Sequence, residues 1–193
     1  MSQSEGITGA SADAIELLIA DHRTVEQLFK QFEAARSDAH VARHLADEIV
    51  KELSIHAVIE EQVLYPTIRK VLPDGGRVAD HAIQEHQEVK DLLTLVDGKD
   101  VADPDVRATL AKIKQVVEGH VAEEESELFP QLREQCDQEH LQKMGDAMEK
   151  AKAIAPTHPH PHAPNEPPLN IVAGLGAAII DKVRDAAKAV MDR

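Results

Sequence analysis

The sequence predicts an all-α protein: an antiparallel four-helix bundle made of two repeated helical hairpins, with an additional C-terminal helix and a tail rich in proline and histidine. Three observations support this fold class. Apolar residues recur every three or four positions over long stretches, no useful stretch alternates apolar and polar residues, and segments of the first half recur in the second half. Only 2 % of the residues are aromatic, and a core of small aliphatic side chains favours packed helices over a β-sandwich.

The first hairpin follows a flexible N-terminal arm, expected at residues 1–12. One helical pattern covers residues 11–36, and its apolar stripe consists of Ile15, Leu18, His22, Val25, Phe29 and Phe32. A second pattern covers residues 39–71, and its stripe consists of Leu45, Ile49, Leu53, His56, Glu60 and Val63. Turn-forming residues at 73–76 separate the two hairpins.

The second hairpin has the same organisation. A helix is predicted at residues 77–97, with a stripe of His86, Val89, Leu93 and Val96. Asp103 and Pro104 are a typical N-cap and first helical residue, so the next helix is expected at 104–135. Its stripe consists of Leu110, Ile113, Val117, His120, Glu124 and Leu128. The bundle is therefore expected to occupy residues 13–135.

Three shorter segments are expected after the bundle. An extra helix is predicted within residues 136–154, and a linker rich in proline and histidine within 155–168, where the prolines forbid a helix. Residues 169–193 form a last amphipathic segment. The histidines of the linker are interpreted as polar linker residues rather than as a metal-binding tract.

Composition limits the classes of function. The formal net charge of −14 argues against nucleic acid and anionic membranes as partners and is compatible with cations. The single cysteine, Cys136, excludes a disulfide within the chain and a cysteine-based metal site. The N-terminal residues lack the charged and apolar regions of a signal peptide, so we expect a cytoplasmic protein, as a monomer or weak homodimer.

The strongest signal in the sequence is an internal repeat with an offset of 64 residues. The segment HAVIEEQVLYP at 56–66 recurs as HVAEEESELFP at 120–130, and DHRTVEQLF at 21–29 recurs as EHQEVKDLL at 85–93. Each hairpin therefore carries one histidine on its first helix and His-x-x-x-Glu on its second. Two such hairpins packed face to face bring both sets together near the bundle axis.

This set of residues predicts a metal site. His-x-x-x-Glu places both side chains one turn apart on the same, apolar helix face. A lone core histidine such as His22 can be satisfied by a backbone carbonyl, and a run of glutamates is usually a solvated face. The complete set is different, because buried carboxylates cost several kcal/mol without a counter-charge, and we expect no lysine or arginine on these stripes at that level. Imidazole and carboxylate ligands suit iron, manganese or zinc, and two carboxylates favour a dinuclear site.

The chain resembles the hemerythrin-like (HHE cation-binding) family over roughly residues 13–135. The resemblance rests on the flanking segments quoted above and on an ordered set of six residues: His22, His56, Glu60, His86, His120 and Glu124. It implies a four-helix bundle around an oxo- or hydroxo-bridged centre of two iron ions, with the histidines as terminal ligands and the glutamates as bridges. It also implies small ligands such as dioxygen, peroxide or nitric oxide.

The sequence departs from the oxygen-carrying hemerythrins on its third helix. Those proteins have a second histidine one turn before the position of His86, where this chain has Ala82. His81 is a candidate further ligand if the helix is locally irregular. Tyr65 and its counterpart Phe129 are expected to pack the end of the bundle, and Tyr65 is also a candidate for a hydrogen bond or a ligand role near the metal. No catalytic residue is expected beyond the metal ligands.

Three hypotheses of function follow. The leading one is a non-heme di-iron protein that binds dioxygen or reactive oxygen and nitrogen species. If it is an enzyme, catalase-like dismutation of hydrogen peroxide is the expected activity, because that reaction needs only a redox pair and an open position. The alternatives are a non-enzymatic sensor of oxygen, nitric oxide or iron, and a structural bundle that binds zinc.

Overall fold

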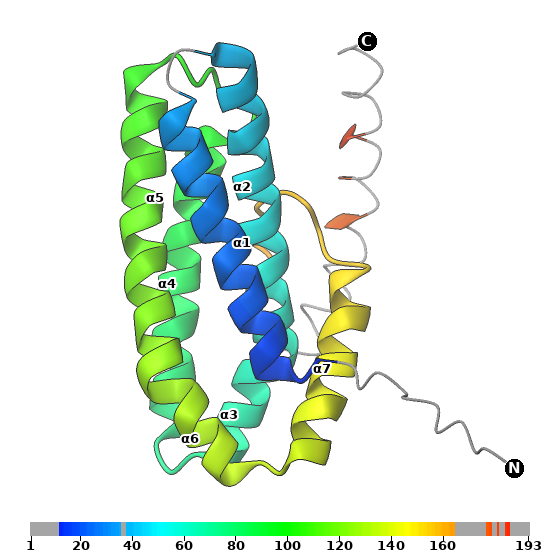
Figure 1. The fold of residues 1–193 in the computed structure, drawn as a ribbon. Coiled ribbons are helices and arrows are strands. Elements are labelled where there is room, and N and C mark those ends of the chain that lie inside the picture. Colours follow the sequence, from blue (N-terminus) through cyan, green and yellow to red (C-terminus); the bar gives the residue numbers. More distant parts are fainter. Residues whose placement is uncertain (1–11, 36–37, 165–176, 179–180, 182–183, 186–193) are drawn as a thin grey trace, which may run out of the picture.

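A computed structural model describes residues 12–35, 38–164, 177–178, 181 and 184–185 of the protein. All regular elements among these residues are helical (Figure 1). They are α1 (Ala14–Ala34), α2 (Ala39–Ile59), η1 (Glu60–Leu64), α3 (Tyr65–Val71), α4 (Gly75–Val96), α5 (Pro104–Glu123), η2 (Glu124–Leu128), α6 (Phe129–Gln135) and α7 (Gln138–Lys152). The predicted all-α bundle is thereby confirmed.

The starts of the helices follow from local sequence. Asp13 caps α1 by accepting hydrogen bonds from the backbone N–H groups of Ile15 and Glu16, and Glu16 bonds back to the backbone of Asp13. Aspartate side chains also cap α2, α5 and α7. These caps satisfy N–H groups that have no partner within a helix and lie at its positive end.

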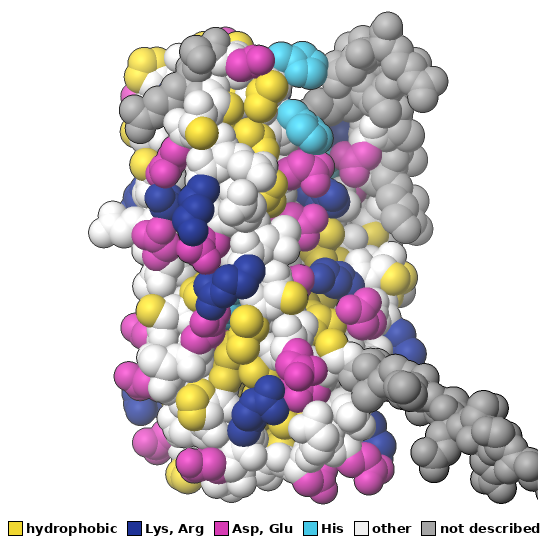
Figure 2. Space-filling view, in the orientation of Figure 1, with side chains coloured by type: hydrophobic (Ala, Val, Ile, Leu, Met, Phe, Trp, Pro, Cys, Tyr) yellow, Lys and Arg dark blue, Asp and Glu magenta, His cyan; other side chains and the backbone are white. Residues whose placement is uncertain are grey.

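Four long helices, α1, α2, α4 and α5, form the bundle, and α7 lies beside it against α1 and α2 (Figure 1). The sharp turn between α3 and α4 depends on Gly75, because a Cβ atom there would lie 2.0 Å from the backbone oxygen of Ile68. The face seen in Figure 2 carries acidic and basic side chains side by side. None of the described helices has the length and apolar character that a membrane crossing requires.

The second and fourth bundle helices each contain one widened turn, η1 and η2. Both turns lie directly before a proline, Pro66 or Pro130, at equivalent places in the repeat. A proline inside an α-helix lacks an N–H donor, and its ring clashes with the carbonyl four residues earlier. An i→i+5 turn avoids this clash, so each helix continues past its proline without a sharp end. The N–H of Tyr65 accordingly bonds to the carbonyl of Glu60.

Two apolar clusters fill the bundle on either side of a polar layer. One cluster includes Leu18, Ile59 and Leu128, and the other includes Val25 and Leu53. Along each of the four long helices, the buried histidine lies between residues of the two clusters. The apolar ends therefore hold the polar layer in the middle of the bundle, away from water.

Some predicted segments fall outside the described residues. These are nearly all of the N-terminal arm at 1–12, residues 165–168 of the linker, and most of the amphipathic segment at 169–193. The described part of the linker, residues 155–164, contains no helix, as its prolines predict.

Candidate metal centre

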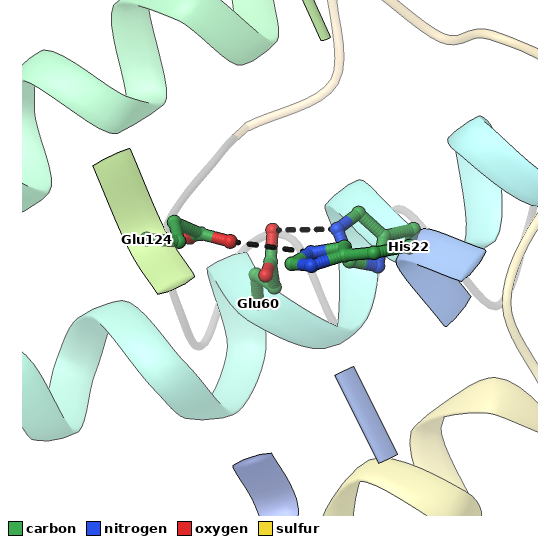
Figure 3. Close-up of side chains that lie close together, drawn as sticks. His22, Glu60 and Glu124 are labelled. Atoms are coloured by element: carbon green, nitrogen blue, oxygen red, sulfur yellow. Dashed lines mark ion pairs between the residues drawn. The ribbon is translucent and has the colours of Figure 1, made fainter. Parts of the chain in front are cut away.

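The polar layer brings together the six residues that the sequence singled out. They come from α1, α2 with η1, α4, and α5 with η2, and none is more than 7 % exposed. They are His22, His56, Glu60, His86, His120 and Glu124. Figure 3 shows the side chains of His22, Glu60 and Glu124 pointing toward one another.

The carboxylate of Glu60 lies between imidazoles of both halves of the chain. Its Oε2 atom is 3.3 Å from Nε2 of His56, 3.2 Å from Nε2 of His86 and 3.9 Å from Nε2 of His120. Glu60 thus contributes to two groups of potential ligands whose atoms lie within 4.8 Å of one another. Glu60 could therefore bind a metal ion in either group.

Glu124 takes the equivalent place from the second half. Its Oε2 atom is 3.4 Å from Nε2 of His22, and its Oε1 atom is 3.4 Å from Nε2 of His120. Its two oxygens therefore face imidazoles that come from different halves of the chain. The two clusters fit a metal centre between the hairpins.

Each of the four histidines has a further carboxylate beside its Nδ1 atom. The pairs are His22 with Glu125 at 2.8 Å, His120 with Glu85 at 2.8 Å, His86 with Glu61 at 3.1 Å, and His56 with Asp21 at 3.9 Å. A carboxylate at Nδ1 fixes the orientation of the ring and leaves Nε2 as the atom available for a metal. All four Nε2 atoms face the centre of the layer.

The outer carboxylates follow the repeat, because Asp21 corresponds to Glu85 and Glu61 to Glu125. Their partners differ in an informative way. Asp21 and Glu85 each contact a histidine of their own half, whereas Glu61 and Glu125 each contact the lone histidine of the other half. Each half therefore helps to position a ring that the other half supplies.

No lysine or arginine was expected on the stripes at this level, but Lys90 lies next to one of them. This residue is buried, and its Nζ atom is 2.7 and 2.8 Å from the two oxygens of Glu61. Lys90 lies one turn after His86 on α4, beside the predicted stripe rather than on it. Its charge neutralises an outer carboxylate and leaves the central ones without a lysine or arginine partner among the described residues.

Several buried polar atoms of the layer have no hydrogen-bond partner within the described chain. They are Oδ2 of Asp21, Nε2 of His22, Nδ1 and Nε2 of His56, Oε1 of Glu60 and Oε2 of Glu124. Buried polar groups are nearly always paired, and an unpaired one costs the free energy of its desolvation. Three of these atoms, Nε2 of His22, Nε2 of His56 and Oε2 of Glu124, face the centre, so a cation bound there would satisfy them.

The electrostatics of the metal-free layer point the same way. Burial opposes the charged form of Glu60, but His56 and its neighbouring histidines hold the pKa of Glu60 well below its usual range. Burial likewise opposes the charged form of His120, yet the charge of Glu124 and nearby carboxylates raises the pKa of His120 well above its ordinary value. A metal ion that binds the Nε2 atom of His120 would have to compete with a proton for it.

Tyr65 is the main difference between the two halves. It is 1 % exposed, and its hydroxyl lies 3.2 Å from Oε2 of Glu60 and 2.9 Å from Nε2 of His86. Burial and the nearby carboxylates, Glu60 first, raise the pKa of Tyr65 well above its ordinary value, so the phenol stays neutral. Its counterpart Phe129 has no hydroxyl and stacks on the ring of His22, with centroids 5.9 Å apart.

His81 does not lie with the six buried residues. Its side chain is 59 % exposed, and its Nε2 atom is 3.6 Å from Glu85 and 3.8 Å from Glu123. Helix α4 is regular here, so the residue four positions before His86, Ala82, lies on the same buried face as His86. His81, five positions before His86, lies on a different face of the helix. His81 therefore reaches the centre only indirectly, because Glu85 contacts His120.

A small apolar cavity adjoins the histidines on the side away from Tyr65. Its volume is about 30 Å³, room for one or two molecules of the size of water. All four histidines line it, together with Lys90, Glu85 and the apolar residues Val25, Leu53, Ala57, Val89, Leu93, Val117 and Val121. The cavity can hold a small neutral molecule directly beside the four rings.

The chain matches the family model described as the hemerythrin HHE cation-binding domain over residues 13–132. The chain belongs to this family. The match covers all six buried residues of the hemerythrin-like layer and ends near the end of α6.

Two relatives place this hemerythrin domain in context. An uncharacterised hemerythrin-like protein of Schizosaccharomyces pombe is 34 % identical over 171 residues, which cover 88 % of this chain and 84 % of the relative. A DNA nickase of Nostoc is 26 % identical over 138 residues, 72 % of this chain, but only 38 % of the nickase is covered. The match to the nickase therefore concerns a part of that protein.

A solved structure shares the fold. It is the crystal structure of a hemerythrin HHE cation-binding domain-containing protein of Mycobacterium kansasii, with a TM-score of 0.62 and 25 % sequence identity. The similarity covers 74 % of this chain and 88 % of that chain. It supports the helical arrangement that positions the hemerythrin-like layer.

Proposed function

We propose that the protein is a non-heme di-iron protein that binds dioxygen or reactive oxygen and nitrogen species in the cavity beside its metal centre. The metal ligands would be the six buried residues, His22, His56, Glu60, His86, His120 and Glu124. The observation that carries this proposal is the convergence of four Nε2 atoms and two carboxylates, several of them unpaired, in a buried layer.

The donor set favours iron over structural zinc. Structural zinc sites are usually closed and hold four ligands, often including cysteine, whereas here six nitrogen and carboxylate donors converge and Glu60 belongs to both groups of potential ligands. A pair of iron ions would supply a redox couple and an open position. The chain itself orients the rings through the outer carboxylates and excludes bulk water with the apolar clusters.

The cavity favours a small neutral ligand. Its lining is largely aliphatic, and its volume of about 30 Å³ suits a molecule of two heavy atoms. Lys90 also lines the cavity, but its ammonium group is paired with the carboxylate of Glu61. This lining suits dioxygen or nitric oxide, and hydrogen peroxide as a neutral substrate.

Metal analysis tests the proposal directly. Protein purified without a tag should contain close to two iron ions per chain, and the ferric protein should show charge-transfer absorption that azide changes. His120→Ala should lower the iron content and alter that spectrum, because it removes a nitrogen that faces both carboxylates. Stoichiometric zinc in a colourless protein would contradict the iron assignment and support the structural zinc alternative.

A second measurement distinguishes an enzyme from a sensor. If the protein dismutates peroxide, oxygen should evolve on addition of hydrogen peroxide, and His120→Ala should abolish the evolution. The surface variant His140→Ala is the matched control and should keep full iron content and activity, since His140 is exposed on α7. An iron-loaded wild type that evolves no oxygen would exclude the catalase-like activity and leave the sensor. A cytoplasmic location and a monomeric or weakly dimeric state stay predictions.

A further inference from the structure

The repeat creates two equivalent grooves on the bundle, one between α1 and α5 and one between α2 and α4. Four lining positions of the α1/α5 groove have counterparts 64 residues away in the α2/α4 groove. These pairs are Glu26 with Lys90, Glu118 with Ser54, Ala122 with Val58, and Glu125 with Glu61. On the basis of the repeat alone, the two grooves would offer equivalent access to the inner cavity.

The two grooves differ because residues 156–164, here called the strap, lie in only one of them. The space in the α2/α4 groove that the strap does not fill has a volume of about 40 Å³ and is lined by strap residues. The α1/α5 groove has a volume of about 290 Å³. The strap is held at several points. The side chain of Gln87 donates to the carbonyl of Pro161 at 3.1 Å, and Nδ1 of His158 lies 3.0 Å from Asp97 at the end of α4.

A second barrier lies under the strap. Lys90 lines both the inner cavity and the space beneath the strap, and its ion pair with Glu61 fixes it between them. Its counterpart in the open groove is Glu26, which instead pairs with Arg23 and Lys30 at the surface. The α2/α4 route is therefore closed twice, by the strap and by a buried ion pair.

The open groove reaches much closer to the metal layer. Four residues, His22, Val25, Val117 and Val121, line both the inner cavity and the α1/α5 groove. The two spaces therefore adjoin at these side chains, and three of the four are valines. Small rotamer changes of such side chains can admit a neutral diatomic molecule, while their apolar surface disfavours anions.

We propose that the α1/α5 groove is the mouth through which small neutral ligands reach the inner cavity, and that the strap and the Glu61–Lys90 pair close the equivalent route. The inference deepens the proposed function and rests on it for the nature of the ligand. Access to the centre is then one-sided, although the centre itself is nearly symmetric.

The repeat supplies a matched pair of variants for a test. Val25 and Val89 are equivalent residues that both line the inner cavity, but only Val25 also lines the open groove. Nitric oxide is mixed with the reduced, iron-loaded full-length protein, and its association and dissociation rates are measured by stopped flow. Val25→Ala should raise both rates about threefold or more and Val25→Ile should lower both, and the equivalent Val89 variants control for the change that each substitution makes in the cavity itself.

The same two substitutions at Val89 should leave both rates within about twofold of the wild type. Equal effects at Val25 and Val89, or none at Val25, would overturn the inference. Exchange of xenon into the cavity, followed by NMR in the same variants, gives a readout that does not involve metal chemistry and should show the same order. If no nitric oxide adduct forms, the proposed function fails, and the xenon comparison alone decides the position of the mouth.

Discussion

Tyr65 and Phe129 occupy the same position in the two repeats, yet only Tyr65 brings a polar atom to the candidate centre. The hydroxyl of Tyr65 lies closest to His86 and Glu60, at 2.9 and 3.2 Å, and is 3.5 Å from both His120 and Glu124, whereas Phe129 stacks on His22. Two metal ions bound in the layer would therefore have unequal surroundings. One would lie near a neutral phenol and the other near an apolar ring.

We predict that Tyr65→Phe keeps two metal ions per chain but weakens binding by up to about tenfold, since one hydrogen bond to a charged carboxylate is lost. The measurement is a competition titration against a chelator, with metal content as the control for folding. The counterpart substitution Phe129→Tyr places a hydroxyl near His22 and should leave the Glu60 side unchanged. An equal loss of affinity in both variants would argue against a specific role of the Tyr65 hydroxyl.

The sequence was sufficient to predict the six central residues because each lies on an apolar stripe, where a polar side chain is conspicuous. The outer groups were harder to predict. Lys90 lies beside its stripe, and its burial depends on an ion pair with Glu61. Glu61 belongs to a pair of adjacent glutamates, a pattern that is typical of a solvated surface. His81 illustrates the converse case, because proximity in sequence suggested a ligand and helix rotation placed the ring at the surface.

The widened turns η1 and η2 carry the two central glutamates, so each bridging candidate sits at the start of a local irregularity. Helices continuing through Pro66 and Pro130 were predicted from the apolar pattern. The widening itself was not predicted, because hydrophobic periodicity does not register one extra residue in a single turn. It matters for the site, since residues five apart approach the same face, as Glu60 and Tyr65 do.

We predict that Pro66→Ala lowers metal affinity by about tenfold or more while the helix content is retained. Without the proline the turn can tighten to an ordinary α-helical turn, which rotates Tyr65 away from Glu60. Metal titration and circular dichroism measure the two effects. Pro104→Ala is the control, because Pro104 is the first residue of α5 and lies far from the layer, so metal affinity should not change. Unchanged affinity in Pro66→Ala would show that the turn is held by other contacts.

In the strap, His158 contacts both the end of α4 and a residue near the C-terminus. Its Nδ1 atom is 3.0 Å from Asp97, and its Nε2 atom is 2.9 Å from Asp185. A neutral imidazole has only one N–H group, so both contacts are hydrogen bonds only when the ring is protonated. The charged groups around it are Asp97, Asp181, Asp185 and Arg184, with His160 close by on Asp181.

The hydrogen bond to Asp97, partly opposed by burial, raises the pKa of His158 above its ordinary value. The docked strap is therefore fully stabilised below the pKa of an undocked histidine, about 6.5, and loses this stabilisation as the pH rises through the raised pKa. We predict that hydrogen exchange at the strap amides, corrected for the intrinsic rates, accelerates across this window by up to about tenfold per pH unit.

His158→Gln tests this assignment, because it should make strap exchange faster and nearly independent of pH. The control is His162→Gln, since His162 is exposed in the same segment and should behave like the wild type. Exchange that does not depend on pH in the wild type would exclude a protonated His158 as the fastening group.

Two of the outer carboxylates contact histidines of the opposite half, which bears on how the two halves are related. Glu61 and Glu125 each orient the lone histidine of the opposite hairpin, and the two central glutamates each face rings from both hairpins. Two copies of a single hairpin would thus contain every kind of donor that a complete centre needs, including the groups that orient them. The present chain therefore has the organisation of a fused homodimer whose two halves differ at Tyr65 and at the strap.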